Sequence, residues 1–173
     1  AQVITANGAA ALLYFLLLVP TWIVGSLWLS RARENAALIA PDRVRLSAVW
    51  AWLGWWVPIV FLWFPKLIVD DSWRITSSAA AAGARGRYRG TGLWWGLWIA
   101  YLFAGKLASN PAIQKRIMGI NNGHQGVVAA LDIAVLLGIL AFAAWVPVVR
   151  GLSQAQTELA RSYGSVVTPL DEK

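Results

Sequence analysis

Two ionisable residues lie inside apolar stretches of the sequence. Lys106 is close to the end of one stretch, and Asp132 lies about two turns into the next. If both stretches are helices joined by the connection between them, the two side chains lie near the same membrane face. We expect them to form an intramembrane ion pair, because an isolated carboxylate in lipid is costly. Such a pair is either a structural contact near the helix ends or a functional group that gates or relays protons.

A second candidate is a basic cluster in a segment rich in glycine and alanine. Arg85, Arg87 and Arg89 alternate with Gly86 and Tyr88. An extended backbone would place the three guanidinium groups on one edge, where they could bind phosphate headgroups or an acidic partner surface. The alternative is a flexible, solvated linker.

Groups for acid–base, metal or cofactor chemistry are scarce. The sequence has no cysteine and one histidine, which excludes disulfides and thiolate metal sites within this chain. His124 stands in a predicted turn beside Asn121 and Asn122, either as a proton-transfer or quinone-site residue or as a surface residue. The catalytic signatures of metalloproteases, serine hydrolases and phosphate-binding loops are missing. We therefore predict no enzyme activity, no catalytic residue, no metal and no cofactor.

The composition indicates a membrane protein. The chain of 173 residues is 58% hydrophobic and 13% charged, whereas soluble domains are about 25% charged. Its mean hydropathy is +0.57. Twelve tryptophans fit this interpretation, since tryptophan collects at membrane–water interfaces. The net charge is +7, and the basic residues lie between apolar stretches, so anionic lipid headgroups are the expected partners and not nucleic acid.

The elements that must position these residues are predicted to be helices. We expect an all-α, integral membrane four-helix bundle that forms one domain over residues 1–163, with a polar tail at 164–173. The predicted spans are residues 8–30, 46–65, 93–109 and 127–149. Short interfacial amphipathic helices are predicted at 66–77, 111–119 and 150–163. The protein would then be a multi-pass protein of the bacterial plasma membrane.

Proline interrupts the predicted spans. Pro58 and Pro65 each remove one helical hydrogen bond from the second span and free the carbonyls of Gly54 and Phe61. Free carbonyls are costly in lipid, so this kinked helix should lean on its neighbours. We expect its tryptophan face to be buried against other helices or a partner. The predicted packing residues are Trp50, Trp55, Trp56, Pro58, Trp63, Pro65 and Trp73.

Charge counting leaves the orientation open. With four spans, the first and third connections share one side of the membrane, and the second connection shares the other side with the termini. The basic residues near the spans divide equally between the two sides, so the positive-inside rule does not choose. The cluster of Arg85, Arg87 and Arg89 favours cytoplasmic termini, where anionic lipid is available.

The central stretch also carries a recognisable motif. The pattern W-x-x-x-x-W-W-x-P-I-x-x-L-W-x-P-x-x-x-x-x-D-x-W-R is formed by Trp50, Trp55, Trp56, Pro58, Ile59, Leu62, Trp63, Pro65, Asp71, Trp73 and Arg74. It resembles the actinobacterial membrane proteins of domain-of-unknown-function family 4328. Phe61 departs from the polar asparagine expected there, so any role of that amide is missing. The resemblance implies a four-helix membrane domain and an actinobacterial source, and it implies no activity.

Two functions compete. The first is a non-catalytic accessory, scaffold or assembly subunit of a larger membrane complex, such as a respiratory or energy-converting assembly, with other membrane subunits as partners. The abundance of tryptophan and the short interfacial helices favour it. The alternative is a small transporter or channel, in which proline-broken helices present free carbonyls and the Lys106–Asp132 pair gates or relays protons.

Overall fold

The computed structural model describes the backbone of residues 2–80, 90–118 and 123–167, and all regular structure among these residues is helical. The chain divides into two compact units, Ala1–Ile75 and Thr76–Lys173, where the sequence predicts a single domain. The fold class is therefore all-α. Each unit is described separately.

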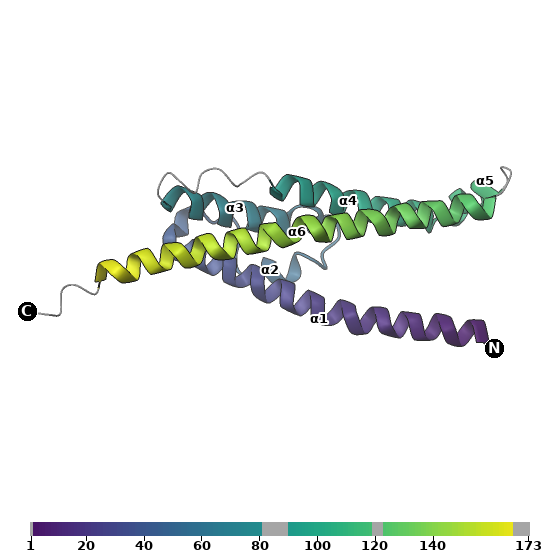
Figure 1. The fold of residues 1–173 in the computed structure, drawn as a ribbon, viewed down its shortest axis with the longest axis horizontal. Coiled ribbons are helices and arrows are strands. Elements are labelled where there is room, and N and C mark those ends of the chain that lie inside the picture. Colours follow the sequence, from purple (N-terminus) through teal and green to yellow (C-terminus); the bar gives the residue numbers. More distant parts are fainter. Residues whose placement is uncertain (1, 81–89, 119–122, 168–173) are drawn as a thin grey trace, which may run out of the picture. The chain divides into compact units, whose positions relative to one another are not determined.

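The first unit begins with one long helix, α1 (Gln2–Ile39), which contains Pro20. It continues beyond the predicted span of residues 8–30, as a helix, through the polar residues that follow. After η1 (Pro41–Arg43), the chain forms the short α2 (Trp50–Leu53) and η2 (Val60–Leu62), and then enters α3 (Phe64–Ala79). Figure 1 labels α1, α2 and α3, and α3 runs on into the second unit.

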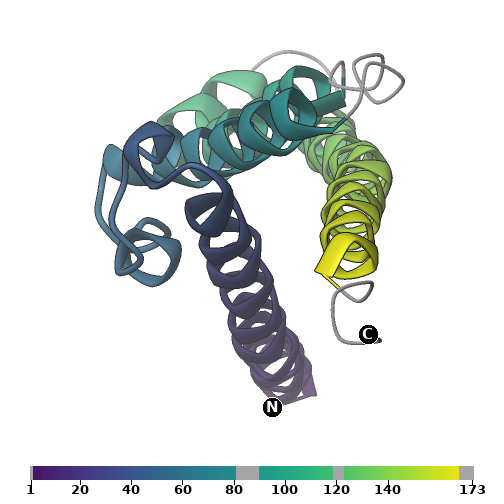
Figure 2. The ribbon, with the colours of Figure 1, turned by 90° about the vertical axis from the view of Figure 1, so that its left-hand side faces the viewer.

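The predicted helical span over residues 46–65 is wrong. The structure has four helical residues at α2, a series of turns, and the single turn of η2. Figure 2 shows this connection in slate blue as a looping segment with short coils. The physical reason lies in residues 54–65, because Pro58 and Pro65 cannot donate to a helix and each disfavours helical geometry in the residue before it. Pro65 instead occupies the first turn of α3, where its missing N–H costs nothing.

The second unit is a helical hairpin. Its helices are α4 (Gly90–Ala108), α5 (Pro111–Met118) and α6 (Gly123–Val167), and α4 and α6 pack side by side (Figure 1). At one end, the Cβ position of Gly90 lies 3.4 Å from Val148, and further along, that of Gly138 lies 3.2 Å from Tyr101. The positions pair in opposite order along the two helices, so the hairpin is antiparallel.

Local signals explain the helix boundaries at the turn of the hairpin. Asn110 accepts hydrogen bonds through its Oδ1 from the backbone N–H groups of Ala112 and Ile113, at 2.9 and 3.4 Å. This side chain therefore caps α5, and Pro111 stands at the first helical position. In contrast, α6 is one helix through Pro147, where the sequence predicts a span at 127–149 and a separate helix at 150–163.

One stretch of the described residues meets the length and composition of a membrane span. It is Asp132–Tyr163 of α6, and only 17% of its most apolar window is buried. Side chains in much of the first half of α1 lie outside the described set. The structure thus contains one candidate membrane helix among the residues that it describes.

Candidate functional site

A buried carboxylate joins two segments of the first unit, α3 and the chain at residue 45. Asp71 on α3 is 2% exposed, and its carboxylate accepts hydrogen bonds from the Arg45 guanidinium. The shortest contact, from Arg45 Nη2 to Asp71 Oδ1, is 2.7 Å, and the Arg45 backbone N–H donates to Oδ2 at 3.3 Å. Arg74, one turn later on α3, donates to Oδ1 at 3.0 Å. We call Arg45, Asp71 and Arg74 the arginine clamp.

Two further contacts extend the clamp to backbone carbonyls. Arg33 on α1 donates from Nε to the carbonyl of Leu46 at 2.7 Å. Arg74 Nη2 donates to the carbonyl of Arg43 at 3.3 Å. The end of α1, residues 43–46 and α3 are therefore held together by charge-assisted hydrogen bonds, which are stronger than neutral ones.

Tryptophans form a second cluster in the same unit. The Trp22 ring on α1 makes edge-to-face contacts with Trp52 and Trp56, at centroid distances of 5.5 and 5.3 Å. Trp50 makes a similar contact with Phe64 at 4.7 Å. This geometry is the one that aromatic pairs prefer. The contacts hold the turns of residues 50–56 against the middle of α1.

Gly54 avoids a steric clash at the start of the turns that follow α2. It is buried, and a Cβ built at this position would lie 2.5 Å from the Trp50 carbonyl oxygen. Real Cβ atoms do not approach backbone this closely, so any side chain at position 54 would force the backbone to move.

A polar stripe runs along one face of α1. Trp22 Nε1, Ser26 Oγ and Ser30 Oγ are spaced four residues apart, and each atom is buried without a hydrogen-bond partner among the described residues. Ser26 is fully buried. Positions four apart share a helix face, so this face of α1 is covered by protein.

The hairpin of the second unit has an aromatic interior. Trp94 on α4 lies 4.2 Å from Trp145 on α6 and 5.0 Å from Trp95, measured between ring centroids. Trp98 lies 5.5 Å from Tyr101, whose ring covers Gly138. Ring packing therefore contributes to the contact between the two helices.

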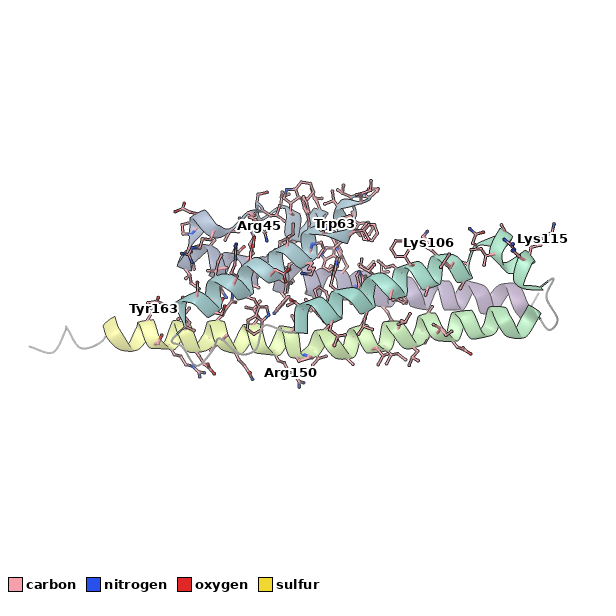
Figure 3. All side chains as sticks on the ribbon, turned by 90° about the horizontal axis from the view of Figure 1, so that it is seen from above. Arg45, Trp63, Lys106, Lys115, Arg150 and Tyr163 are labelled. Atoms are coloured by element: carbon pink, nitrogen blue, oxygen red, sulfur yellow. The ribbon has the colours of Figure 1, made fainter. Side chains whose placement is uncertain are left out.

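The predicted ion pair does not form. The antiparallel register places Lys106 and Asp132 at the same level of the hairpin, as expected from the sequence. Both side chains are exposed, and no ion pair among the described residues joins them. Figure 3 shows Lys106 projecting from α4 away from α6. A role for these residues in the membrane stays a prediction.

The other predicted site residues fall into three groups. Pro65 and Trp73 are buried, Trp50 and Trp55 are half-buried, and Pro58, Trp56 and Trp63 are exposed. Trp55 donates from Nε1 to the carbonyl of Ala51 at 3.1 Å. The three basic residues at positions 85, 87 and 89, and the side chain of His124, lie outside the described residues.

Sequence reasoning missed Arg45 and Trp22. A signal for Arg45 was present, because it directly precedes the uncharged stretch and Asp71 follows that stretch, so the two opposite charges flank it. No local pattern marks Trp22, since its partners lie 30 and 34 positions further along the chain. In addition, Lys66 pairs with Asp70 one turn later on α3.

The described residues include no group of three or more His, Cys, Asp or Glu side chains that could hold a metal ion. The arrangement provides packing and fixed ion pairs. Its one buried carboxylate among the described residues, Asp71, is saturated with donors.

Comparison with known proteins identifies a family. The model of the family described as Domain of unknown function (DUF4328) matches residues 3–154. No curated protein and no solved structure matches the chain. The match covers most of the sequence, including the arginine clamp, the tryptophan cluster and all of the hairpin up to residue 154 of α6, and the chain therefore belongs to the family of the domain of unknown function DUF4328.

Proposed function

We propose that this protein is a non-catalytic, multi-pass subunit of a membrane complex, which it serves as a scaffold. The proposal includes a location in a bacterial plasma membrane, which the apolar window of α6 supports. The observation that carries the proposal is the outer surface of the α4–α6 hairpin. Its exposed large apolar side chains are Leu93, Phe103, Leu107, Ile133, Val135, Leu136, Ile139, Leu140 and Phe142.

This surface suits lipid and not water. Soluble monomers rarely expose contiguous apolar patches larger than a few hundred Å². A soluble core helix of this hydropathy would be mostly buried, whereas the apolar window of α6 is 17% buried. Trp94, Trp145 and Tyr101 contribute to the contact between the helices, and the exposed side chains are aliphatic or phenylalanine.

The scaffold role is supported by how the charged groups are used. The buried Asp71 binds two arginines, and Lys66 binds Asp70. These groups therefore hold backbone segments in place, which suits a protein that presents fixed surfaces to partners.

Photo-crosslinking in native membranes tests this function. A photoreactive amino acid at Phe103 or Phe142 is expected to give discrete protein adducts, because these exposed apolar residues would face neighbouring subunits or lipid. Position 154, exposed on the polar part of α6, serves as the control. Adducts with lipid alone at Phe103 and at Phe142 would contradict a subunit role.

A further inference from the structure

The chain segments that flank residues 46–65 are held together. At its start, the Leu46 carbonyl accepts the hydrogen bond from Arg33 of α1. Directly before it, Arg45 binds Asp71, which follows the stretch on α3. The clamp therefore brings together the chain before and after the stretch, and a segment closed in this way returns to where it began.

The middle of the stretch lies far from the arginine clamp along α1. Trp52 and Trp56 contact Trp22, which precedes Arg33 by eleven positions on α1. Eleven residues of helix measure about 16 Å, or roughly half of a 30 Å hydrocarbon core. The part of α1 from Trp22 to Ser30 carries no charge. The stretch thus descends beside the uncharged part of α1 and comes back.

The reversal is sharp and its backbone hydrogen bonds are internal. Ile59 has φ 70° and ψ −50°, and Val60 donates to the Pro58 carbonyl at 2.8 Å, which defines a γ-turn with positive φ. The N–H groups of Trp56, Val57, Phe61, Leu62 and Trp63 also donate to carbonyls within residues 53–60. Backbone in lipid must satisfy its polar groups in this manner.

The side chains around the reversal are apolar and exposed. Ile59 is 72% exposed, Trp56 59% and Trp63 55%. Tryptophan is favoured at membrane interfaces, and isoleucine deeper in the acyl region. No charged residue occurs between positions 46 and 65.

We propose that residues 46–65 form a re-entrant loop that enters one leaflet of the bilayer and leaves on the side from which it came. One side of the loop packs against Trp22 of α1, and the exposed side chains of Trp56, Ile59 and Trp63 on its other side contact lipid. The proposal rests on the proposed membrane location.

A re-entrant loop at residues 46–65 changes which basic residues lie on each side of the membrane. Without a crossing at residues 46–65, α1, α4 and α6 cross the bilayer, and the connection between α1 and α4 shares a side with the C-terminal part of α6. Of the fifteen basic residues, twelve then lie on that side and three, Lys106, Lys115 and Arg116, lie on the other. The positive-inside rule, undecided for four spans, assigns the side with twelve to the cytoplasm.

The experiment introduces one cysteine at a time. Because the native chain has no cysteine, each variant carries a single labelling site. Ser47→Cys, Ser78→Cys and Ser109→Cys are conservative changes at exposed positions. Each full-length variant is expressed in bacteria and treated with a membrane-impermeant maleimide, in spheroplasts and after permeabilisation. We expect Ser109→Cys to be labelled in intact spheroplasts, and Ser47→Cys and Ser78→Cys only after permeabilisation.

Four crossings would place positions 47 and 109 on one side and position 78 on the other, and this result would overturn the loop. Labelling of all three positions from one side would overturn the crossing of α4. An outward-facing pair at 47 and 78, with position 109 inside, would overturn the orientation assigned from the charge count and leave the loop in place. Alkaline extraction of the same membranes separates the two proposals. Release of the wild-type chain into the supernatant refutes the membrane location, whereas retention with the labelling pattern of four crossings refutes only the loop.

Discussion

At the scale of single residues, the first unit depends on one carboxylate. Asp71 is buried, yet the side chains of Arg45 and Arg74 are 54% and 58% exposed. The solvent-exposed parts of the two arginine side chains keep the guanidinium charges hydrated. The carboxylate accepts several hydrogen bonds from these charged donors. The clamp therefore fixes the chain segments without burying three full charges.

We predict that Asp71→Asn lowers the free energy of unfolding by about 1–3 kcal/mol, because hydrogen bonds between charged groups are weakened and the exposed arginines recover water. Denaturant unfolding in detergent micelles measures the change. Asp42→Asn is the control, since Asp42 is exposed on η1. Equal effects of the two substitutions would contradict a special role for Asp71.

A second residue-scale prediction concerns Gly54→Ala. The added Cβ would meet the Trp50 carbonyl oxygen at 2.5 Å, so the start of the turns must shift. We expect a loss of about 1–3 kcal/mol, as for other overpacked sites. Gly96→Ala is the matched control, because nothing lies within 4 Å of its Cβ position. Helix propensity predicts that this control is neutral or stabilising. Thermal unfolding of both variants measures the difference in stability.

At the scale of elements, sequence patterns located most helices but misjudged the central stretch. The predicted 93–109 and 111–119 match α4 and α5 closely, because apolar content and the Asn110-Pro111 start signal are local. The stretch of residues 46–65 passed as a span because hydropathy measures apolar content and not backbone geometry. Pro58 and Pro65 are local signals against a continuous helix, but the path of the chain also depends on Arg33, Trp22 and Asp71, which lie outside the stretch.

The hairpin supplies an element-scale prediction. Trp94 and Trp145 stack across α4 and α6 at 4.2 Å, and aromatic pairs add about 0.5–1.5 kcal/mol beyond their buried area. A double-mutant cycle with Trp94→Leu and Trp145→Leu should measure a coupling of this size. Trp94 and Leu107 lie thirteen residues apart on α4, about 20 Å along the helix, and Trp94→Leu with Leu107→Ala provides the control cycle. A coupling near zero for the first cycle would show that the rings do not join the helices.

At the scale of the whole molecule, the candidate functional residues are spread over several surfaces and do not line one pocket. Composition alone predicted a membrane protein with few chemical groups, and the apolar outer face of the hairpin supports that prediction. The membrane orientation could not be predicted from the sequence, because it depends on how many stretches cross the bilayer. That number changes when residues 46–65 turn back.

Phe142→Arg tests the surroundings of the molecule. Phe142 is 68% exposed on α6, so this change would alter stability by less than about 0.5 kcal/mol on a water-facing surface. In lipid, an arginine near a helix centre costs about 2.5–3.5 kcal/mol on insertion scales. We expect a marked loss of membrane-integrated protein, measured by glycosylation-mapped or protease-protected insertion. Gln154→Arg on the same helix should insert normally.

The γ-turn at Ile59 has a consequence for biogenesis. Because the loop returns to its own side, only α1 of the first unit must pass through the translocon, and residues 40–75 can fold against it from the cytoplasm while the ribosome is still making α4. A nascent chain stalled after α3 should already protect Trp56 from a water-soluble quencher, before the hairpin exists.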